Sequence, residues 1–473
     1  MDGQSLFLFV RSLLPLLIVI LLSLSPVCEV IAAPLRSANL ARLSHRPVVV
    51  VQALERAYQF EPWRGELLEE IGVNAFRAGD TVKALQAFEQ AAVGHQMSLF
   101  SQYIMGEAYL ADGEAVKALA IWETLVDFPL APLEVFDALY QAQYRFENYE
   151  GALLTLSKWV ERQPDRADLN YQLGLFLSVQ SPEKAVGYLE KASRVDKAYR
   201  SKADKLIAVL NQVQSVSAIS RRRRMIGQAL GDLGEWKMAK WAFAQAVQQS
   251  PADADNLAYL AEAKAQLKQD NSEELAEAVK RDAQSVVVRG VVALQWRREG
   301  KPELALVNYY ALAAQEPENS IWQIEIGNTL SEMGDIQAAL RHFERATEME
   351  PQNPLTWLAL SEFCVTHGLA VRTVGLPAAR QALLLSPDNP LGLDVLGKTL
   401  HALGDFPGSE RAFLSALRTD PGFAVAHFDL GKLYLQYGKR DAAWHHLTQA
   451  YQLSADGSPV RVMAERALER YYP

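Results

Sequence analysis

A short residue pattern recurs along this chain with a period of 34 residues over most of its length. Its register position, most often a small residue, is occupied in turn by Gly72, Gly106, Tyr140, Gly174, Gly227, Ala261, Ala293, Gly327, Ser361, Gly397 and Gly431. A fixed period of this size is typical of solenoids, because each unit can bury its apolar face only against its neighbours. We therefore expect a stack of similar units and no separate catalytic domain.

The unit at residues 326–351 is the best preserved and shows what the period encodes. Its small and apolar positions are Ile326, Gly327, Leu330, Gly334, Ala339, Phe343, Ala346 and Pro351. They fall three or four residues apart on each side of Gly334, which predicts two amphipathic helices joined by a tight turn. Gly327 allows the two helices to approach closely, Phe343 fills the space beside it, and Pro351 ends the second helix.

This set of residues resembles the tetratricopeptide repeat, which has a small residue in its first helix and Ala, Phe, Ala and Pro along and after its second. The same types recur at Gly72, Gly79, Ala84, Phe88 and Ala91, at Gly227, Gly234, Ala239, Phe243, Ala246 and Pro251, and at Gly397, Gly404, Phe413, Ala416 and Pro421. The resemblance extends over roughly residues 45–455. It implies an all-α chain, folded as a right-handed superhelical solenoid of about 11 antiparallel helix pairs behind an N-terminal apolar leader.

The period is interrupted at three places. The step from Gly174 to Gly227 is 53 residues long, and the surplus residues, 203–217, have the apolar spacing of one additional helix. Lys268 stands where most units have the turn glycine, and two residues are inserted after Gly368. We expect local bulges or hinges at these places.

These observations give the expected domain organisation. The segments are a signal peptide or signal anchor at 1–33, an N-terminal helix or half-repeat at 34–64, a first repeat block at 65–198, an additional helix at 199–219, a second repeat block at 220–455 and a capping helix at 456–473. The half-repeat is expected because Leu54, Ala57 and Pro62 stand where the second helix of a unit would end.

The N-terminal segment differs from the rest of the chain. Arg11 interrupts an apolar run over residues 7–22, and small residues follow as far as Ala32 and Ala33. This order matches a cleaved secretory signal peptide. A retained signal anchor is the alternative, since the apolar run could nearly span a bilayer and Pro34 disfavours cleavage directly before it. We expect exported or membrane-anchored repeats outside the cytoplasm, or repeats facing the cytoplasm if an anchor inserts in the opposite orientation.

One catalytic motif is complete in sequence but has the wrong context. Residues 392–399 match a phosphate-binding loop, in which Lys398 would reach the terminal phosphates. Such a loop follows a strand and opens a helix, whereas Gly397 is expected in the middle of a helix. Cys364 and His367 share a helix face, but Cys364 falls at a packing position. We therefore expect no catalytic residues, no metal site and no cofactor, in a protein that is not an enzyme.

The formal net charge of −9 disfavours nucleic acid as a partner. Four consecutive arginines, Arg221 to Arg224, are the exception. They open the first helix after the additional one, where positive charge opposes the helix dipole. Two interpretations stay open: a solvated helix start, or a charge that an acidic partner or a phosphate neutralises.

The resemblance implies that partners bind in a concave groove lined by the first helix of each pair. The groove-facing candidates are Tyr103, Glu107, Gln141, Tyr144, Tyr171, Arg221, Arg224, Gln228, Arg297, Asn328, Glu362, Lys398, His401 and Lys432. Their mixture suggests a peptide or helix held by side-chain hydrogen bonds and aromatic contacts. The lysine and asparagine clamp by which some members bind a terminal carboxylate is not evident, because the equivalent positions hold Glu69, Val73, Tyr103 and Glu107.

These features favour a non-catalytic scaffold that binds another protein. The chain looks like the bacterial envelope proteins in which such arrays assemble secretion, polysaccharide or outer-layer machinery, and this resemblance suggests a role in envelope assembly or secretion. Two alternatives stay open: an accessory or catalytic component of glycan processing, and a cytosolic repeat regulator whose apolar leader is a core helix. Contact with a membrane is expected only through the leader, if it is uncleaved.

Overall fold

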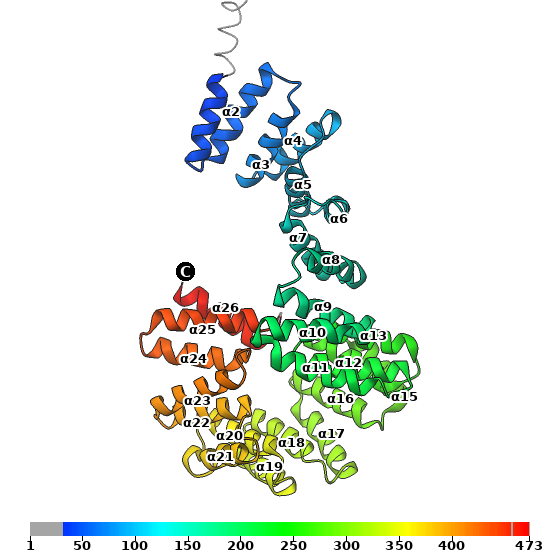
Figure 1. Ribbon diagram of the computed structural model, residues 1–473. Coiled ribbons are helices and arrows are strands. Elements are labelled where there is room, and N and C mark those ends of the chain that lie inside the picture. The colour runs from blue at the N-terminus through cyan, green and yellow to red at the C-terminus, as the bar shows by residue number, and fades with distance from the viewer. Residues whose placement is uncertain (1–31, 456, 473) are drawn as a thin grey trace, which may run out of the picture. The chain divides into compact units, whose positions relative to one another are not determined.

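The computed structural model of the chain describes residues 32–455 and 457–472 (Figure 1). Over these residues the secondary structure consists of helices and their connecting turns, without a strand. The predicted leader at residues 1–33 lies outside the described residues, apart from its last two positions, which begin a helix at residues 32–43. None of the helices described is both long enough and apolar enough to cross a membrane.

The chain forms two compact units that divide between Gln163 and Pro164. Helices of the first unit are α2 (Pro47–Phe60), α3 (Gly65–Arg77), α4 (Thr81–Gly94), α5 (Leu99–Ala111), α6 (Ala115–Leu125), α7 (Leu133–Arg145) and α8 (Tyr149–Arg162). Leu54 and Ala57 of α2 are fully buried, as expected for the second helix of an opening half-repeat. The pairs α3/α4, α5/α6 and α7/α8 follow it, each packed across a tight turn.

The second unit continues the same alternation of first and second helices. Its helices are α9 (Ala167–Gln180), α10 (Pro182–Val195), α11 (Arg200–Val213), α12 (Ile219–Asp232), α13 (Trp236–Gln249), α14 (Ala254–Gln266), α15 (Ser272–Asp282), α16 (Val286–Arg298), α17 (Pro302–Gln315), α18 (Ile321–Glu332), α19 (Ile336–Met349), α20 (Pro354–His367), α21 (Leu376–Leu385), α22 (Pro390–Ala402), α23 (Phe406–Thr419), α24 (Ala424–Gln436), α25 (Arg440–Leu453) and α26 (Pro459–Tyr471). Each register position from Gly72 to Gly431 lies in the first helix of its own pair.

The glycines of the register are points of close approach between paired helices. A Cβ added to Gly106 would lie 2.1 Å from Nε1 of Trp122, and one added to Gly227 would lie 2.5 Å from the ring of Phe243. Real Cβ atoms essentially never come within 3.0 Å of such neighbours. The predicted packing of a small residue against a large residue of the second helix is therefore confirmed.

A left-handed residue seven positions after the register position marks the tight turn in every pair except α9/α10, where Ser181 has a φ of −146°. Positive φ angles occur there at Gly79, Gly113, Glu147, Gly234, Lys268, Gly300, Gly334, Gly368, Gly404 and Gly438. Glu147 and Lys268 adopt φ angles of 59° and 57°, which cost residues with a Cβ about 1–2 kcal/mol each. The stacking of the units therefore outweighs the local backbone preference at these two turns.

A second repeated contact joins consecutive units. The side chain four residues before the register position donates a hydrogen bond to the carbonyl of a proline. That proline precedes the donor by six residues and follows the end of the preceding second helix. The three pairs are Asn170 with Pro164 at 2.7 Å, Trp357 with Pro351 at 2.9 Å, and His427 with Pro421 at 3.1 Å. Each bond satisfies the backbone carbonyl of a proline that lies two residues beyond the end of the second helix, in the connection to the next unit.

The interruptions of the period have distinct structures. The additional helix is present as α11, which follows a short 3₁₀ turn, η1 (Lys197–Tyr199), and packs between α10 and α12. It therefore lies inside the second compact unit. The two residues inserted after Gly368 are accommodated by a π-helical turn, η2 (Val371–Gly375), directly before α21. The last helix, α26, packs on α25.

Candidate partner-binding groove

The four arginines at the start of α12 do not form one uniform patch. Arg224 contacts Asp253 at 3.0 Å and Asp255 at 3.6 Å, at the start of α14. Asp253 also caps α14 by accepting hydrogen bonds from its backbone. Arg221 is exposed. The charge of Arg224 is thus balanced by the next unit of the same chain, which removes the need for an acidic partner at this residue.

Arg297 of α16 is held in the same way by the following first helix. Its guanidinium lies 2.7 Å from Glu325 of α18 and also pairs with Glu332. Burial alone would lower the pKa of Arg297, but its hydrogen bond to Glu332 and the charges of the two glutamates outweigh burial and raise that pKa. Arg297 therefore fixes one first helix to the next and is occupied by the chain itself.

Lys398 of α22 lies among three carboxylates from three consecutive first helices. Its Nζ is 2.8 Å from Asp394, 3.5 Å from Asp429 and 3.7 Å from Glu362. Asp394 is fully buried, so this lysine supplies the counter-charge that the buried carboxylate requires. Residues 392–399 lie within the continuous helix α22, which confirms that this segment lacks the strand–loop–helix geometry of a phosphate-binding loop.

Tyr171 is a correction to the predicted groove. Its side chain is only 2% exposed, and its ring lies 5.0 Å from that of Tyr199 in η1. The segment that precedes the additional helix covers it, so Tyr171 does not present a surface to a partner. The 34-residue register could not reveal this, because η1 has no counterpart in the other units.

The remaining candidates of the second unit lie on first helices, and some of them contact neighbouring units. Gln228 donates to the hydroxyl of Tyr259 at 2.6 Å, and His401 is 2.9 Å from the side-chain oxygen of Gln436. The others are Asn328 in α18, Glu362 in α20 and Lys432 in α24, whose Nζ lies 3.6 Å from Asp429.

Four candidates belong to the first unit. Burial raises the pKa of Tyr103 to about 12, with the nearby charge of Glu107 acting in the same direction. Tyr144 stacks on Tyr140 with ring centroids 5.8 Å apart, and Gln141 is exposed. These side chains lie on α5 and α7.

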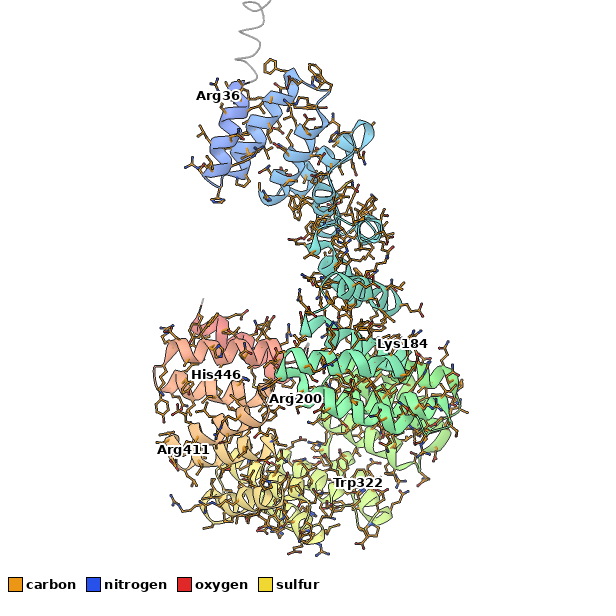
Figure 2. All side chains as sticks on the ribbon, in the orientation of Figure 1. Arg36, Lys184, Arg200, Trp322, Arg411 and His446 are labelled. Atoms are coloured by element: carbon orange, nitrogen blue, oxygen red, sulfur yellow. The ribbon has the colours of Figure 1, made fainter. Side chains whose placement is uncertain are left out.

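An apolar groove crosses the first helices α14, α16 and α18 and has a volume of about 510 Å³. Its lining consists of Tyr259, Glu262, Val286, Val287, Gly290, Val291, Leu294, Tyr309, Glu316, Asn319, Ile321, Trp322 and Glu325. Trp322, labelled in Figure 2, comes from α18. The space above Gly290 is open, because a Cβ added there would meet only Trp322, at an ordinary contact distance of 3.8 Å.

The polar residues of this groove include three glutamates and neither lysine nor arginine. Glu262 and Glu325 are paired with Arg298 and Arg297. Glu316 differs, because its carboxylate accepts hydrogen bonds from two neutral donors, the indole of Trp322 and the amide of Asn319, each at 2.9 Å. These bonds orient the carboxylate at the edge of an apolar surface without cancelling its charge.

The predicted site residues missed the floor of this groove. The register predicts that residues 286–294 belong to one more first helix, and the candidate site residues were selected from polar positions of such helices. Gly290 carries the missed signal: it lies in the middle of α16, where glycine costs about 1 kcal/mol relative to alanine. The register position of this unit is Ala293, so helix packing does not require a glycine at 290.

A smaller cavity of about 430 Å³ lies in the first unit and is lined largely by polar side chains. Glu69 at its wall accepts hydrogen bonds from the backbone and hydroxyl of Ser98 at 3.1 and 2.9 Å and lies 2.5 Å from His95. This carboxylate has a structural role in joining α3 to the start of α5, and it occupies a place where a carboxylate-binding clamp would need a cation.

Two further groups of potentially reactive side chains, a cysteine and a pair of histidines, have packing roles. Cys364 is fully buried, and burial raises the pKa of its thiol to about 11. His446, labelled in Figure 2, lies 2.9 Å from His427 through their Nδ1 atoms. Within residues 32–455 and 457–472, no three side chains of His, Cys, Asp or Glu are grouped so that they could hold a metal ion.

Comparison with known sequences shows that one segment of the chain matches a known family. The sequence model of the tetratricopeptide repeat matches residues 323–353, which span most of α18 and all of α19. Residues 323–353 are therefore similar to a tetratricopeptide repeat. The apolar groove uses the first helix of this repeat together with the first helices of the two preceding units.

The chain is also similar to other known proteins. It is 28% identical over 160 residues to the BBSome complex member bbs-4 of Caenorhabditis elegans, a match that spans 32% of this chain and about a third, 34%, of that protein. Among solved structures, yeast Tom70 is 14% identical with a TM-score of 0.45 and covers 93% of this chain and 95% of its own. The Cut9 and Hcn1 hetero-tetramer of the APC/C is 13% identical with a TM-score of 0.40, covering 94% and 98%.

Proposed function

We propose that this protein is a non-catalytic scaffold that binds a segment of another protein in the apolar groove of α14, α16 and α18. The observation that supports the proposal is the groove itself, where apolar side chains from three units meet around an open position at Gly290. Three of the groove-facing cations predicted from sequence, Arg224, Arg297 and Lys398, are bound to carboxylates of this chain, so they contribute rigidity to the scaffold rather than contacts to a partner.

The proposed occupant is an apolar segment, helical or extended, that carries a lysine or arginine. Apolar side chains suit the surface of Val287, Ile321 and Trp322, since burying them there releases water from both partners. A basic residue suits Glu316, whose own partners are neutral. The net charge of −9 favours the approach of cationic partners over acidic ones.

Peptide selection against the full chain tests this proposal. A displayed library of random peptides is selected on the wild-type protein, and the enriched peptides are then measured against Gly290→Trp, whose indole would fill the open space in the groove. We expect enriched sequences with apolar residues and at least one lysine or arginine, and a loss of affinity of about tenfold or more in Gly290→Trp.

The matched control is Gly187→Trp, which adds the same side chain to the exposed face of α10, where nothing lies within 4 Å of an added Cβ. Binding should be unchanged in this variant. Enrichment of acidic peptides, or equal affinity for Gly290→Trp and the wild type, would overturn the proposed site.

The cellular place of the scaffold is a separate part of the proposal. We propose that the repeats are exported or membrane-anchored and act in envelope assembly or secretion, which the apolar, small-residue composition of residues 1–33 supports. Mass spectrometry of the native N-terminus tests it. A start after residue 32 or 33, or an intact N-terminus in the membrane fraction, is expected; an intact Met1 form that is soluble in the cytosol would refute export.

A further inference from the structure

The two ends of the second unit touch each other. Lys202 of α11 donates a hydrogen bond from its Nζ to the carbonyl of Leu453 at the end of α25, 251 residues away. Ala455 lies 3.6 Å from the position of a Cβ added to Gly234. Figure 1 shows the end of α25 beside α10 and α11, so the path of helices in this unit returns to its start.

The closest of these contacts is between backbones. A Cβ added to Gly422, in the turn between α23 and α24, would lie 1.8 Å from the carbonyl oxygen of Ala198 and 2.8 Å from its carbonyl carbon. Because the neighbour is backbone, it cannot rotate away as a flexible side chain could. The φ of Gly422 is not in the left-handed region, so alanine is compatible with the turn itself. A glycine is therefore required at 422 by the contact with Ala198 and not by the turn.

Charged groups complete the contact. Lys202 is largely buried, and the carboxylates of Glu235 and Asp420 act on it from the two sides of the contact. Asp420 also accepts a hydrogen bond from the backbone of Gly422 at 2.9 Å, which shapes the turn that meets Ala198. A buried lysine is stable only with such partners, so its place here depends on the C-terminal repeats.

The residues that receive the C-terminal repeats belong to the segment that breaks the 34-residue period. Ala198 lies in η1 and Lys202 in α11, and neither element has a counterpart between other pairs. Lys202 lies on α11, the helix that also contains most of the surplus residues 203–217.

We propose that the additional segment, Lys197–Val213, is a docking site for the C-terminal repeats of the same chain, and that this seam separates from and rejoins them. The seam consists of Ala198 and Lys202 on one side and Gly422 and Leu453 on the other. Its contacts are the close approach of the backbone of Gly422 to that of Ala198 and the hydrogen bond from Lys202 to the carbonyl of Leu453. Contacts of this kind open locally at a lower free-energy cost than the stacked core of the repeats. Opening of the seam frees the first and last repeats of the unit to move apart.

Distance measurement on the full-length protein tests the seam. Spin labels are attached to Asp204→Cys and Gln452→Cys, both at exposed positions beside the seam, after Cys28→Ser and Cys364→Ala remove the native thiols. Double electron–electron resonance then gives the distribution of distances between them. In this labelled background with Gly422 and Lys202 intact we expect a predominant short distance.

The seam variants are Gly422→Ala and Lys202→Met, each of which should shift most of the population to longer distances while circular dichroism shows an unchanged helix content. The matched controls are Gly187→Ala, an unobstructed glycine of α10, and Lys205→Met, an exposed lysine of the same helix α11. Both should keep the short distance.

Three results would overturn the proposal. The short distance could be absent from the starting protein, or it could persist in Gly422→Ala. It could also disappear when labelled protein is diluted with unlabelled protein, which would show that the C-terminal repeats dock onto a second copy.

Discussion

At the scale of single residues, the register glycines carry the fold because they let paired helices meet. The sequence predicted these contacts, since the 34-residue period marks both the glycine and its large partner. It could not predict the pairs between consecutive first helices, such as Arg297 with Glu325. Several carboxylates on neighbouring units are candidate partners for each cation. The rotation between units decides which of them the cation contacts.

Gly106→Ala tests the close approach of paired helices in the first unit. The added methyl would meet the indole of Trp122, which is fully buried and bonded to the carbonyl of Tyr103, so the ring has little room to move. We expect the free energy of unfolding to fall by about 1–3 kcal/mol, measured by urea denaturation. Gly94→Ala, at the open end of α4, is the control and should be neutral or stabilising. Equal stability of the two variants would show that the glycine is not a packing requirement.

Lys268→Gly tests the cost of a side chain in a left-handed turn. Lys268 has a φ of 57° and an exposed side chain, so glycine removes backbone strain without removing a buried group. We expect stabilisation by about 1 kcal/mol in thermal unfolding. The reciprocal change, Gly300→Ala at φ 69° in the turn between α16 and α17, should destabilise the protein by a similar amount. A loss of stability in Lys268→Gly would mean that the lysine side chain contributes more than its backbone costs.

At the scale of elements, the prediction of helix pairs, tight turns and the additional helix was accurate because each has a local signal in spacing or in a turn residue. The form of the insertion after Gly368 was not predictable. Two extra residues could have formed a loop, and the structure instead absorbs them in the π-helical turn of residues 371–375. This turn keeps Gly375 so close to α20 that a Cβ added to it would lie 3.0 Å from the Cβ of Cys364.

The contact between α24 and α25 predicts a pH dependence of stability. Burial, with the nearby charges of His427 and His445, lowers the pKa of His446 to about 4. The unfolded chain has a histidine pKa of about 6.5 and binds the proton more readily. Stability from this group is therefore present above about pH 6.5 and is lost as the pH falls toward 4.

We expect the free energy of unfolding to fall by about 1 kcal/mol more between pH 7 and pH 4.5 in the wild type than in His446→Gln, measured by urea denaturation at both values. His95→Gln, a histidine of the first unit, serves as the comparison. An identical pH dependence in the wild type and His446→Gln would contradict a neutral, buried His446.

At the scale of the whole molecule, the period predicted a solenoid but neither the groove nor the seam. The groove depends on an open position at Gly290 combined with Trp322 of the next unit. The period contains no information about empty space beside a glycine. The seam joins residues 251 positions apart. It results from small rotations that add up over many units, and a local pattern cannot give their sum.

Site-specific photocrosslinking in living cells tests the central claim, that a partner occupies the groove, most directly. A photoreactive residue replaces Ile321, which lines the groove and is 42% exposed, and in a control it replaces Val307, which is 67% exposed on α17 outside the lining. The account predicts that Ile321 captures one defined protein through an apolar segment containing lysine or arginine, identified by mass spectrometry, and that Glu316→Gln weakens the capture. Equal capture from Val307, or capture from Val307 alone, would contradict it.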